Sequence, residues 1–585
     1  MSPVDLPEPP RTIPTLGLAW RRLTESVWRV EHAFERSKAA GRAADDTRLR
    51  IFFILAIFAL GFLTLAVEAG RAALWSKAGG AGLGVPAPAQ ARADLTDRTG
   101  RLMAVDLTHY GLYLDPRDIW DTGEVRRDLV AALPKLPRER LEKALASRRR
   151  EYLMGGLTPQ ERETIRDFGL PGVEFEEEER RVYPLGRSAA HLIGFADSGG
   201  HGLAGAERAL EQGLSGAAAK GEPTALAIDL RVQGALEDEL RKAVAKYSAV
   251  GGIGMVVNVR TGEILGYSSQ PDFDPNQPGD AAPAALVNRG AASVYELGSV
   301  FKAFTLAMAL DSGIASLDTP FDVSQPLEIG GGRIHDFDKG DTTLRLWEVF
   351  THSSNIAAAK IALRAGPQRM KDYFGRFGLL SAAPSELAES ARPILPARFD
   401  DNTLAHIAFG QGISVSPLAL VTGYRALLDG GVYSPLTIRK VPPGTRPEGK
   451  RVISEATASA MLQLMRLNVT DPKGSGRKAD SPGLFVGGKT GSAQKPENGR
   501  YGRNNVSSFV AVFPSVGPID SDRYIVLITL DSPHATPDTF GFITAGFNAA
   551  PTAGLVIDRI APFLGVRRAA MTPPQAPPSA LPGAE

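Results

Sequence analysis

This chain of 585 residues contains no cysteine. Disulfides, thiolate zinc sites and cysteine nucleophiles are therefore excluded as explanations of its fold or chemistry. It also lacks an excess of charge, since the formal net charge is +1, and no basic stripe interleaved with aromatic residues indicates a nucleic-acid partner. The eight histidines show no metal-ligand spacing, and neither G-x-S-x-G nor H-E-x-x-H occurs. We expect neither a metal site nor a cofactor.

One uncharged apolar run near the N-terminus, Ile51–Val67, is just long enough to span a bilayer as a helix. Basic residues such as Arg48 and Arg50 precede this run, and few follow it. A cleaved signal peptide is excluded because about fifty residues precede the run, and a buried core helix would rarely lack almost every polar position. We predict a single-pass transmembrane helix at residues 49–68 of the inner (cytoplasmic) membrane, with the N-terminus cytoplasmic and the remainder exported.

Composition divides the rest of the chain into regions. The predicted regions are a cytoplasmic tail at residues 1–48, a Gly/Pro-rich linker at 69–91, a first exported region at 92–222, a larger region at 223–568 and a disordered Pro-rich tail at 569–585. The first exported region mixes strand-like and helical patterns. The larger region has apolar strand candidates at both ends and helices between them, which predicts an α/β domain whose terminal strands share one mainly antiparallel sheet.

Local patterns predict three details. Thr158, followed by Pro159 and Glu161, is typical of a helix start with a capping box. The turn at residues 260–263 lies between two apolar runs and indicates a β-hairpin. The charged run at residues 176–181 is interpreted as a solvated face of a strand or loop.

The pattern S-x-x-K occurs three times, so a match alone means little. The three pairs are Ser299/Lys302, Ser475/Lys478 and Ser492/Lys495. The second pair is interpreted as turn chemistry, and the third runs out of a strand toward a proline. Only the first opens a helical pattern, with Gly313 as its predicted stop.

Residues i and i+3 share a helix face, so Ser299 Oγ and Lys302 Nζ can meet. A serine hydroxyl is a weak nucleophile until a nearby base takes its proton. A buried lysine near the positive end of a helix is pushed toward its neutral form and can be that base. A capping serine followed by a solvent-directed lysine is the structural alternative, and the pair alone favours it.

Two further motifs shift the balance toward catalysis. Ser353 and Asn355 form S-x-N ahead of another helical run, and Lys489, Thr490 and Gly491 form K-T-G on an apolar strand. The order S-x-x-K, S-x-N, K-T-G is the set used by serine penicillin-recognising enzymes. Three short motifs in this order, each in a fitting context, are far more specific than any one of them.

The run Gly483–Thr490 also matches the phosphate-binding loop G-x-x-x-x-G-K-[ST]. That loop must connect a strand to a helix whose N-terminus holds the phosphates. Residues 484–486 have a strand pattern inside the supposed loop, and the residues after Thr490 show no helical periodicity. An exported site would also lie away from ATP, so we reject nucleotide binding.

With these motifs in place, the chain resembles the class B penicillin-binding proteins, and within them the cell-division branch. The stretches Arg92–Ala104 and Gly202–Gly216, with Glu207, match the pedestal of that family, and Gly410–Gly412 lies in a further match. The resemblance implies a penicillin-binding-protein/serine β-lactamase-like α/β transpeptidase domain with helices flanking a mainly antiparallel sheet. It also implies an elongated, non-catalytic α+β pedestal of the dimerisation-domain type.

The resemblance also implies the reaction. Ser299 would be acylated by a peptidoglycan stem peptide with loss of the terminal D-alanine, and an amine of a neighbouring stem peptide would resolve the acyl-enzyme into a cross-link. The implied catalytic residues are Ser299, Lys302, Ser353, Asn355 and Lys489, and the implied substrate-binding residues are Thr490, Gly491 and Ser492. β-Lactam antibiotics would acylate Ser299 as substrate mimics. We therefore expect Lys302 to be buried, close to Ser299 Oγ and bonded to the S-x-N side chains.

Family analogy places the protein at the division septum and supplies its partners. No glycosyltransferase region lies between the predicted anchor and the pedestal, so polymerisation would need an FtsW-type membrane glycosyltransferase, alongside other membrane proteins of the division machinery. The open alternatives are an elongation-type transpeptidase, a D,D-carboxypeptidase or an anchored β-lactamase, and a non-catalytic scaffold or β-lactam sensor. Leu297 stands where the family usually has proline, and Ser492 where threonine is more frequent.

Overall fold

The computed structural model describes residues 92–569, apart from 219, 338–339 and 498–499, together with residues 29, 58, 62 and 63. Residues 92–569 all belong to one compact unit, Pro86–Glu585. The predicted transmembrane span at 49–68 lies almost wholly outside the described residues, as do the two predicted tails and the linker. Among the residues that are described, no helix is long and apolar enough to cross a bilayer.

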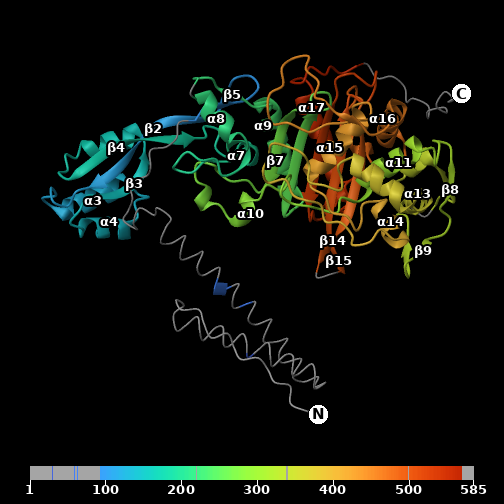
Figure 1. Ribbon diagram of the computed structural model, residues 1–585, viewed down its shortest axis with the longest axis horizontal. Coiled ribbons are helices and arrows are strands. Elements are labelled where there is room, and N and C mark those ends of the chain that lie inside the picture. The colour runs from blue at the N-terminus through green and yellow to red at the C-terminus, as the bar shows by residue number, and fades with distance from the viewer. Residues whose placement is uncertain are drawn as a thin grey trace, which may run out of the picture. The chain divides into compact units, whose positions relative to one another are not determined.

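Residues 92–222, the pedestal region, contribute six helices and four strands of a five-stranded sheet (Figure 1). The strands are β1 (Leu95–Thr96), β2 (Leu102–Leu114), β3 (Glu151–Leu157) and β4 (Val173–Val182), joined by β5 (Thr224–Ala225). The helices are α3 (Thr122–Ala132), α4 (Arg138–Leu145), α5 (Pro159–Arg166), α6 (Ala190–Ile193), α7 (Gly205–Ala209) and α8 (Glu211–Ala218). Strand β2 pairs with β1, β3 and β4, all antiparallel. Leucines of β2 and β3 form a separate core with leucines of α3 and α4. This core includes Leu112 of β2, Leu129 of α3 and Leu153 of β3.

Helix α5 begins as the sequence predicts. Thr158 Oγ1 accepts a hydrogen bond from Glu161 N, and the Glu161 carboxylate accepts one from Thr158 N. This reciprocal capping box satisfies two N–H groups that the first helical turn would otherwise leave unpaired.

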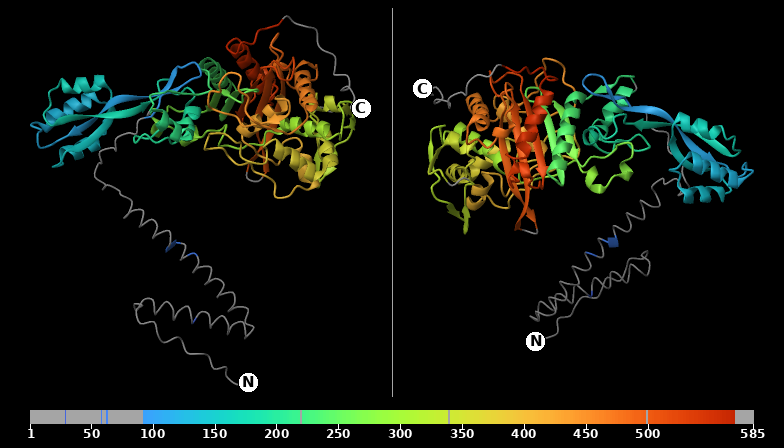
Figure 2. Two further views of the ribbon diagram at one scale, coloured as in Figure 1. Left: turned by 45° about the horizontal axis from the view of Figure 1, so that its top comes forward. Right: turned by 180° about the vertical axis from the view of Figure 1, so that it is seen from behind.

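The second sheet has five strands in the order β14-β15-β16-β6-β7, and every neighbouring pair is antiparallel. The strands are β6 (Gly251–Asn258), β7 (Ile264–Gln270), β14 (Gly487–Glu497), β15 (Arg500–Phe513) and β16 (Tyr524–Asp531). Strands from both ends of the larger region thus lie side by side, as predicted (Figures 1 and 2). The β6–β7 hairpin turns at the predicted residues 260–263.

Both faces of this sheet are buried, and side chains alternate between two cores because successive residues of a strand point to opposite faces. In β16, Ile525 and Leu527 join one core, while Val526 and Ile528 join the other. The second core is completed by α9 (Leu230–Lys246) and α17 (Ala549–Ile560). The first is completed by α11 (Lys302–Asp311), α13 (Asn355–Arg376), α15 (Pro417–Leu428) and α16 (Glu455–Thr470).

Shorter elements connect these layers. The helices are η1 (Pro278–Asp280), α10 (Pro283–Leu286), the 3₁₀ helix η2 (Gly298–Phe301), α12 (Leu346–Thr351), α14 (Asp401–Ile407), η3 (Arg477–Ala479) and η4 (Pro537–Thr539). The strands are β8 (Pro320–Asp322), β9 (Leu327–Ile329), β10 (Gly332–Ile334), β11 (Thr343–Arg345), β12 (Val432–Tyr433) and β13 (Lys450–Arg451). They form three two-stranded ribbons at the margins of the helical layer.

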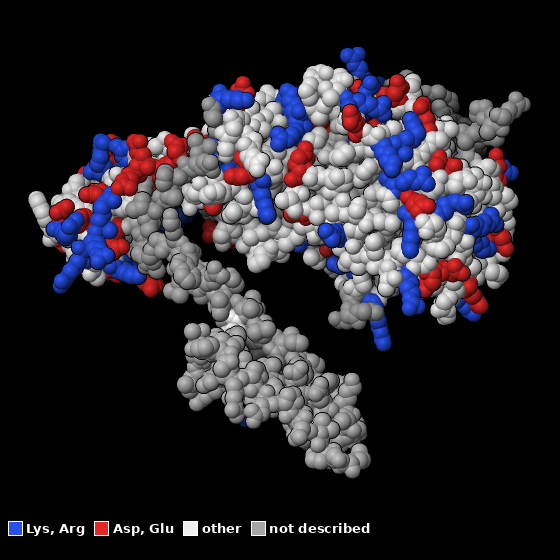
Figure 3. Space-filling view, in the orientation of Figure 1, with Lys and Arg blue, Asp and Glu red and all other residues white. Residues whose placement is uncertain are grey.

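The charged run at residues 176–181 is a solvated strand face only in part. It forms most of β4, and five of its six side chains are exposed or half-buried. Arg181 is the exception, because its guanidinium is buried and donates to Glu207 Oε1 over 2.7 Å. Successive side chains of a strand point to opposite faces, and Arg181 points inward. Charge alone does not predict this orientation. Elsewhere on the face in Figure 3, Lys and Arg lie among Asp and Glu with no field of one sign over the described residues.

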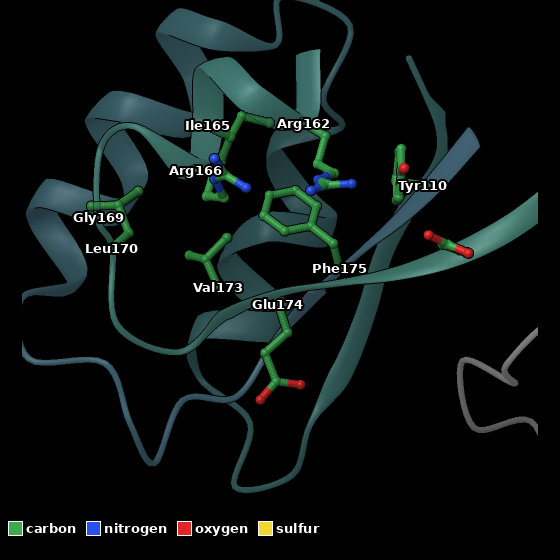
Figure 4. Close-up of a pocket in the computed structure, with 10 residues that line it drawn as sticks. Tyr110, Arg162, Ile165, Arg166, Gly169, Leu170, Val173, Glu174 and Phe175 are labelled. Carbon is green, nitrogen blue, oxygen red and sulfur yellow. The ribbon is translucent and has the colours of Figure 1, made fainter. Parts of the chain in front are cut away.

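A cleft of about 630 Å³ opens in the pedestal region between α5 and the strands β2 and β4 (Figure 4). Its wall is apolar at Ile165, Leu170 and Phe175, with Arg162 beside Tyr110 at one end. The guanidinium carbon of Arg162 lies 4.4 Å from the centre of the Tyr110 ring. The cleft contains none of the residues that the three motifs predict.

Candidate active site

Ser299 lies in the 3₁₀ helix η2, and Lys302 begins α11 directly after it. The sequence predicted an α-helix from Ser299 onward, so the regular helix starts three residues later than expected. A 3₁₀ helix has three residues per turn and eclipses the side chains of residues i and i+3. The tighter turn therefore keeps Ser299 and Lys302 on one side. Helix α11 ends at Asp311 with Ser312 as its C-cap, and Gly313 follows with a φ of 70°, so the predicted stop is confirmed.

Lys302 is completely buried, as expected, and its ammonium group faces the S-x-N turn. Its Nζ donates to Asn355 Oδ1 over 2.7 Å, to Ser353 Oγ over 3.1 Å and to the carbonyl oxygen of Ser353. In the part of the chain that the structure describes, no hydrogen bond joins Lys302 Nζ to Ser299 Oγ. Burial lowers the pKa of Lys302 to about 7, against a smaller opposing effect of the Asp336 carboxylate.

The three partners of Lys302 restrict how a neutral amine can sit in this site. A carbonyl oxygen and an amide oxygen can only accept, whereas the hydroxyl of Ser353 can accept or donate. A neutral Lys302 keeps two N–H bonds for the two obligate acceptors. Its lone pair then faces the Ser353 hydroxyl or a neighbouring proton donor. Ser353 can therefore pass a proton to or from Lys302.

The S-x-N turn is strained at Ser353, whose φ of 61° lies in the left-handed region. This conformation presents both the carbonyl oxygen and the hydroxyl of Ser353 to Lys302. Ser354 then caps α13, because its Oγ accepts from Ala357 N over 3.0 Å. Strained residues of this kind persist where the surrounding structure holds them, and they concentrate at functional sites.

Lys489 lies on β14 and is fully buried. Its cross-strand partner is Val510, which belongs to the same core as α11, so Lys489 points toward the helical layer. Its Nζ donates to Ser353 Oγ over 2.9 Å. Burial, and secondarily the positive charge of Lys302, hold the pKa of Lys489 well below its usual range.

Thr490 and Ser492 point to the opposite face of β14 from Lys489, because strand side chains alternate. Thr490 Oγ1 donates to Ser475 Oγ over 2.6 Å. Ser492 Oγ accepts from Ala545 N over 2.9 Å. Since β14 is an edge strand of the sheet, these hydroxyls lie beside a backbone edge that is free of a further strand in the described sheet.

Gly491 brings β14 against the turn that carries Ser299. A Cβ added to Gly491 would lie 2.2 Å from the carbonyl oxygen of Leu297 and 2.9 Å from Val300 Cγ1. On the other side of the contact, a Cβ on Gly298 would lie 3.1 Å from Ser492 N. The two backbones can approach this closely only because both positions are glycine.

Comparison with known proteins agrees with this arrangement. Residues 252–546 match the penicillin binding protein transpeptidase domain, and residues 87–222 match the penicillin-binding protein dimerisation domain. The chain is 54% identical over 554 residues to a probable peptidoglycan D,D-transpeptidase FtsI of Caulobacter vibrioides, covering 94% of each chain. It belongs to the class B penicillin-binding proteins of the FtsI type.

More distant members of the family match most of the chain as well. A probable peptidoglycan D,D-transpeptidase PenA of Neisseria gonorrhoeae is 32% identical over 487 residues, covering 78% of this chain and 82% of the relative. The peptidoglycan D,D-transpeptidase FtsI of Escherichia coli K12 is 29% identical over 513 residues, covering 82% and 85%.

This penicillin-binding protein brings its three motifs together in one place. The S-x-N turn bonds both motif lysines, and K-T-G packs against the turn of S-x-x-K. The strand predicted at residues 484–486, inside the match to a phosphate loop, is wrong, because β14 starts only at Gly487. Thr490 still lies within a strand and not at a helix start, so the matched residues lack the geometry of that loop.

Sequence reasoning missed two side chains that border this site in the penicillin-binding protein. Ser475, interpreted as turn chemistry alone, accepts from Thr490 and donates to Asn468 Oδ1 over 3.0 Å. The second is Asp336, whose carboxylate contacts the S-x-N turn. Ser475 did carry a signal, as part of a discarded S-x-x-K match. Asp336 carried none, since a lone aspartate in a loop is indistinguishable from a solvated one.

Proposed function

We propose that this penicillin-binding protein is a peptidoglycan D,D-transpeptidase that cross-links stem peptides of the septal wall through an acyl-enzyme on Ser299. The observation that carries the proposal is the buried Lys302, whose pKa of about 7 makes a neutral amine available near neutral pH. A buried lysine held by Ser353 and Asn355 is poorly explained as a structural residue, because burying an ammonium group is costly.

Acylation would begin when Ser299 Oγ attacks the carbonyl of the penultimate D-alanine while Lys302 accepts the hydroxyl proton. The same proton would then pass to the departing D-alanine nitrogen, directly or through Ser353, which bonds both lysines. An amine of a second stem peptide would attack the ester, and Ser299 would regain its proton. Every step is a proton transfer or an acyl transfer.

Charge that develops on the carbonyl oxygen would be stabilised by the backbone N–H groups of Ser299 and Ser492. The close approach of Gly298 to Ser492 supports this pairing. Thr490 and Ser492 would bind the substrate carboxylate, and Gly491 would keep β14 close to the nucleophile. The donor peptide would add to β14 as a further strand. β-Lactams would acylate Ser299 in the same way.

The proposal extends to the layout of the chain. A cytoplasmic tail (1–48), an inner-membrane helix (49–68) and a linker (69–91) would precede a pedestal (92–222) and a transpeptidase domain (223–568), with a Pro-rich tail after it. The uncharged run Ile51–Val67 and the two domain matches support this layout. An FtsW-type glycosyltransferase and other division proteins of the membrane would supply and regulate the polymer.

The direct test is incubation of the purified protein with a stem-peptide donor and an amine acceptor, followed by mass spectrometry of the products. Cross-linked product that disappears in Ser299→Ala is the expected result. Hydrolysed donor without cross-links would indicate a carboxypeptidase instead. An inactive wild type that also fails to bind penicillin would indicate a scaffold. Depletion of the protein in cells distinguishes a division-type from an elongation-type transpeptidase. Arrested septation is expected, whereas loss of rod shape would indicate the elongation type.

A further inference from the structure

Asp336 lies in the segment after β10 and contacts three successive residues, the last two of the S-x-N motif and the residue that follows it. Its Oδ1 accepts from Asn355 N over 2.6 Å and from Ile356 N over 3.0 Å, and its Oδ2 accepts from Ser354 Oγ over 2.6 Å. Ser354 is the N-cap of α13 and its Oγ accepts from Ala357 N, so this cap does not reach the first two N–H groups of the helix. Asp336 satisfies the first two N–H groups of the helix from outside it.

The neighbouring residue fixes the orientation of the catalytic amide. The carbonyl oxygen of His335 accepts from Asn355 Nδ2 over 3.1 Å. A carbonyl can pair only with the NH₂ end of the amide, so Asn355 Oδ1 is turned toward Lys302. His335 and Asp336 therefore hold Asn355 at two points: the Asp336 carboxylate binds its backbone N–H, and the His335 carbonyl binds its side-chain amide.

We infer that Asp336 is a positioning residue for acylation, which holds the S-x-N turn in register with Lys302 and supplies the negative charge opposite that lysine. This inference rests on the proposed function. Asp336 touches no reacting atom in it, and acts through Asn355, Ser354 and the charge that it places beside the base.

The charge of Asp336 changes the pKa of Lys302 in a definite direction. The Asp336 carboxylate opposes the effect of burial and keeps the pKa of Lys302 from falling further. Among the described residues packed around Lys302, Lys489 of β14 is the ionisable group that shares the Ser353 hydroxyl with it, and the pKa of Lys489 is itself depressed. His352, at the end of α12, is paired with Asp341 over 2.9 Å. Loss of the Asp336 charge alone must therefore lower the pKa of Lys302.

Two substitutions separate charge from geometry. Asp336→Asn keeps an acceptor for the two helix N–H groups and removes the charge, whereas Asp336→Ala removes both. Asp400 offers a matched control, because it caps α14 by accepting from Thr403 N over 2.8 Å without contact to the motif residues. The rate constant for acylation by a fluorescent penicillin is measured from about pH 5 to about pH 9, with thermal unfolding of each variant.

We expect the acid limb of the profile to move to lower pH by roughly 0.5–1 unit in Asp336→Asn and Asp336→Ala. The alkaline plateau should fall roughly 10- to 100-fold in Asp336→Ala, because a small misplacement of the base is costly. Asp400→Ala should keep both the limb and the plateau within about twofold.

An unshifted limb in Asp336→Asn overturns the charge role, and a plateau in Asp336→Ala equal to that of Asp400→Ala overturns the positioning role. If Asp336→Ala does not fold, Asp336→Glu replaces it and must keep the wild-type limb with a lowered plateau. Failure of the proposed function is distinguishable, because the wild type itself would then not be acylated at any pH.

Discussion

Lys302 and Lys489 donate to the same hydroxyl, Ser353 Oγ, over 3.1 and 2.9 Å. The charged forms of two lysines buried around one acceptor are disfavoured, because each ammonium group is removed from water and repels the other. The pKa of both lysines lies below the ordinary value. One hydroxyl thus connects two bases from motifs that are distant in the sequence.

The first prediction concerns pH. The base form of Lys302 is the neutral amine, and its pKa is lowered to about 7. The rate of acylation by penicillin should therefore fall about tenfold per pH unit below about pH 7 and level off above it. Stopped-flow measurement on the wild type checks this, with thermal unfolding at each pH to show that the fold persists. A flat profile from about pH 5 to about pH 9 contradicts the assignment of Lys302 as base.

The second prediction concerns the shared hydroxyl. Ser353→Ala removes the side-chain acceptor of Lys489 and one of the partners of Lys302, so we expect acylation to slow by roughly 10²- to 10⁴-fold. Ser312→Ala is the control, because Ser312 lies at the far end of α11 and its hydroxyl donates to the Met308 carbonyl. A Ser353→Ala variant that is acylated as fast as Ser312→Ala would show that the hydroxyl carries no proton and orients neither lysine.

The third prediction concerns the close approach of β14 to the turn that carries Ser299. Gly491→Ala places a Cβ 2.2 Å from the Leu297 carbonyl, and either the strand or the turn must move. We expect a loss of about 1–3 kcal/mol in the free energy of unfolding and much slower acylation. Gly234→Ala, inside α9 with nothing within 4 Å of the added Cβ, should instead gain about 0.5–1 kcal/mol. Equal effects at both glycines would mean that the contact is not tight.

The fourth prediction concerns the pedestal region. Glu207 is fully buried and accepts from Arg92 and Arg181, whereas Glu211, which also pairs with Arg92, is 35% exposed at its side chain. Glu207→Ala leaves two buried arginines without this carboxylate and should cost about 3–5 kcal/mol of unfolding free energy. Glu211→Ala should cost about 1 kcal/mol or less. Chemical denaturation measures both, and a cost at Glu207 no larger than at Glu211 contradicts this account of the pedestal core.

Much of this could be predicted from the sequence, because the signals are local or periodic. The capping box at Thr158 depends on residues three apart, and the two-faced burial of β16 fits its apolar run Ile525–Ile528. Each motif lies in the kind of element that the sequence predicted, with Ser299 at a helix start, the S-x-N residues ahead of a helix and K-T-G on a strand. Burial of Lys302 and its bonds to Ser353 and Asn355 were expected and are confirmed.

What the sequence could not predict depends on contacts between distant segments. Arg181 is buried because it pairs with Glu207, and the sequence around Arg181 does not indicate this partner. Ser475 meets Thr490 because a loop after α16 returns to β14. The 3₁₀ helix that carries Ser299 packs at Gly298 against β14, and local helix propensity does not contain this contact. Tertiary contact decides each of these.

The most direct measurement is mass spectrometry of the intact protein after exposure to benzylpenicillin, followed by peptide mapping. The account predicts one covalent adduct per chain, located on Ser299, and no adduct in a folded Ser299→Ala variant. An adduct on another residue, an adduct that persists in Ser299→Ala, or a folded wild type that forms none would contradict it.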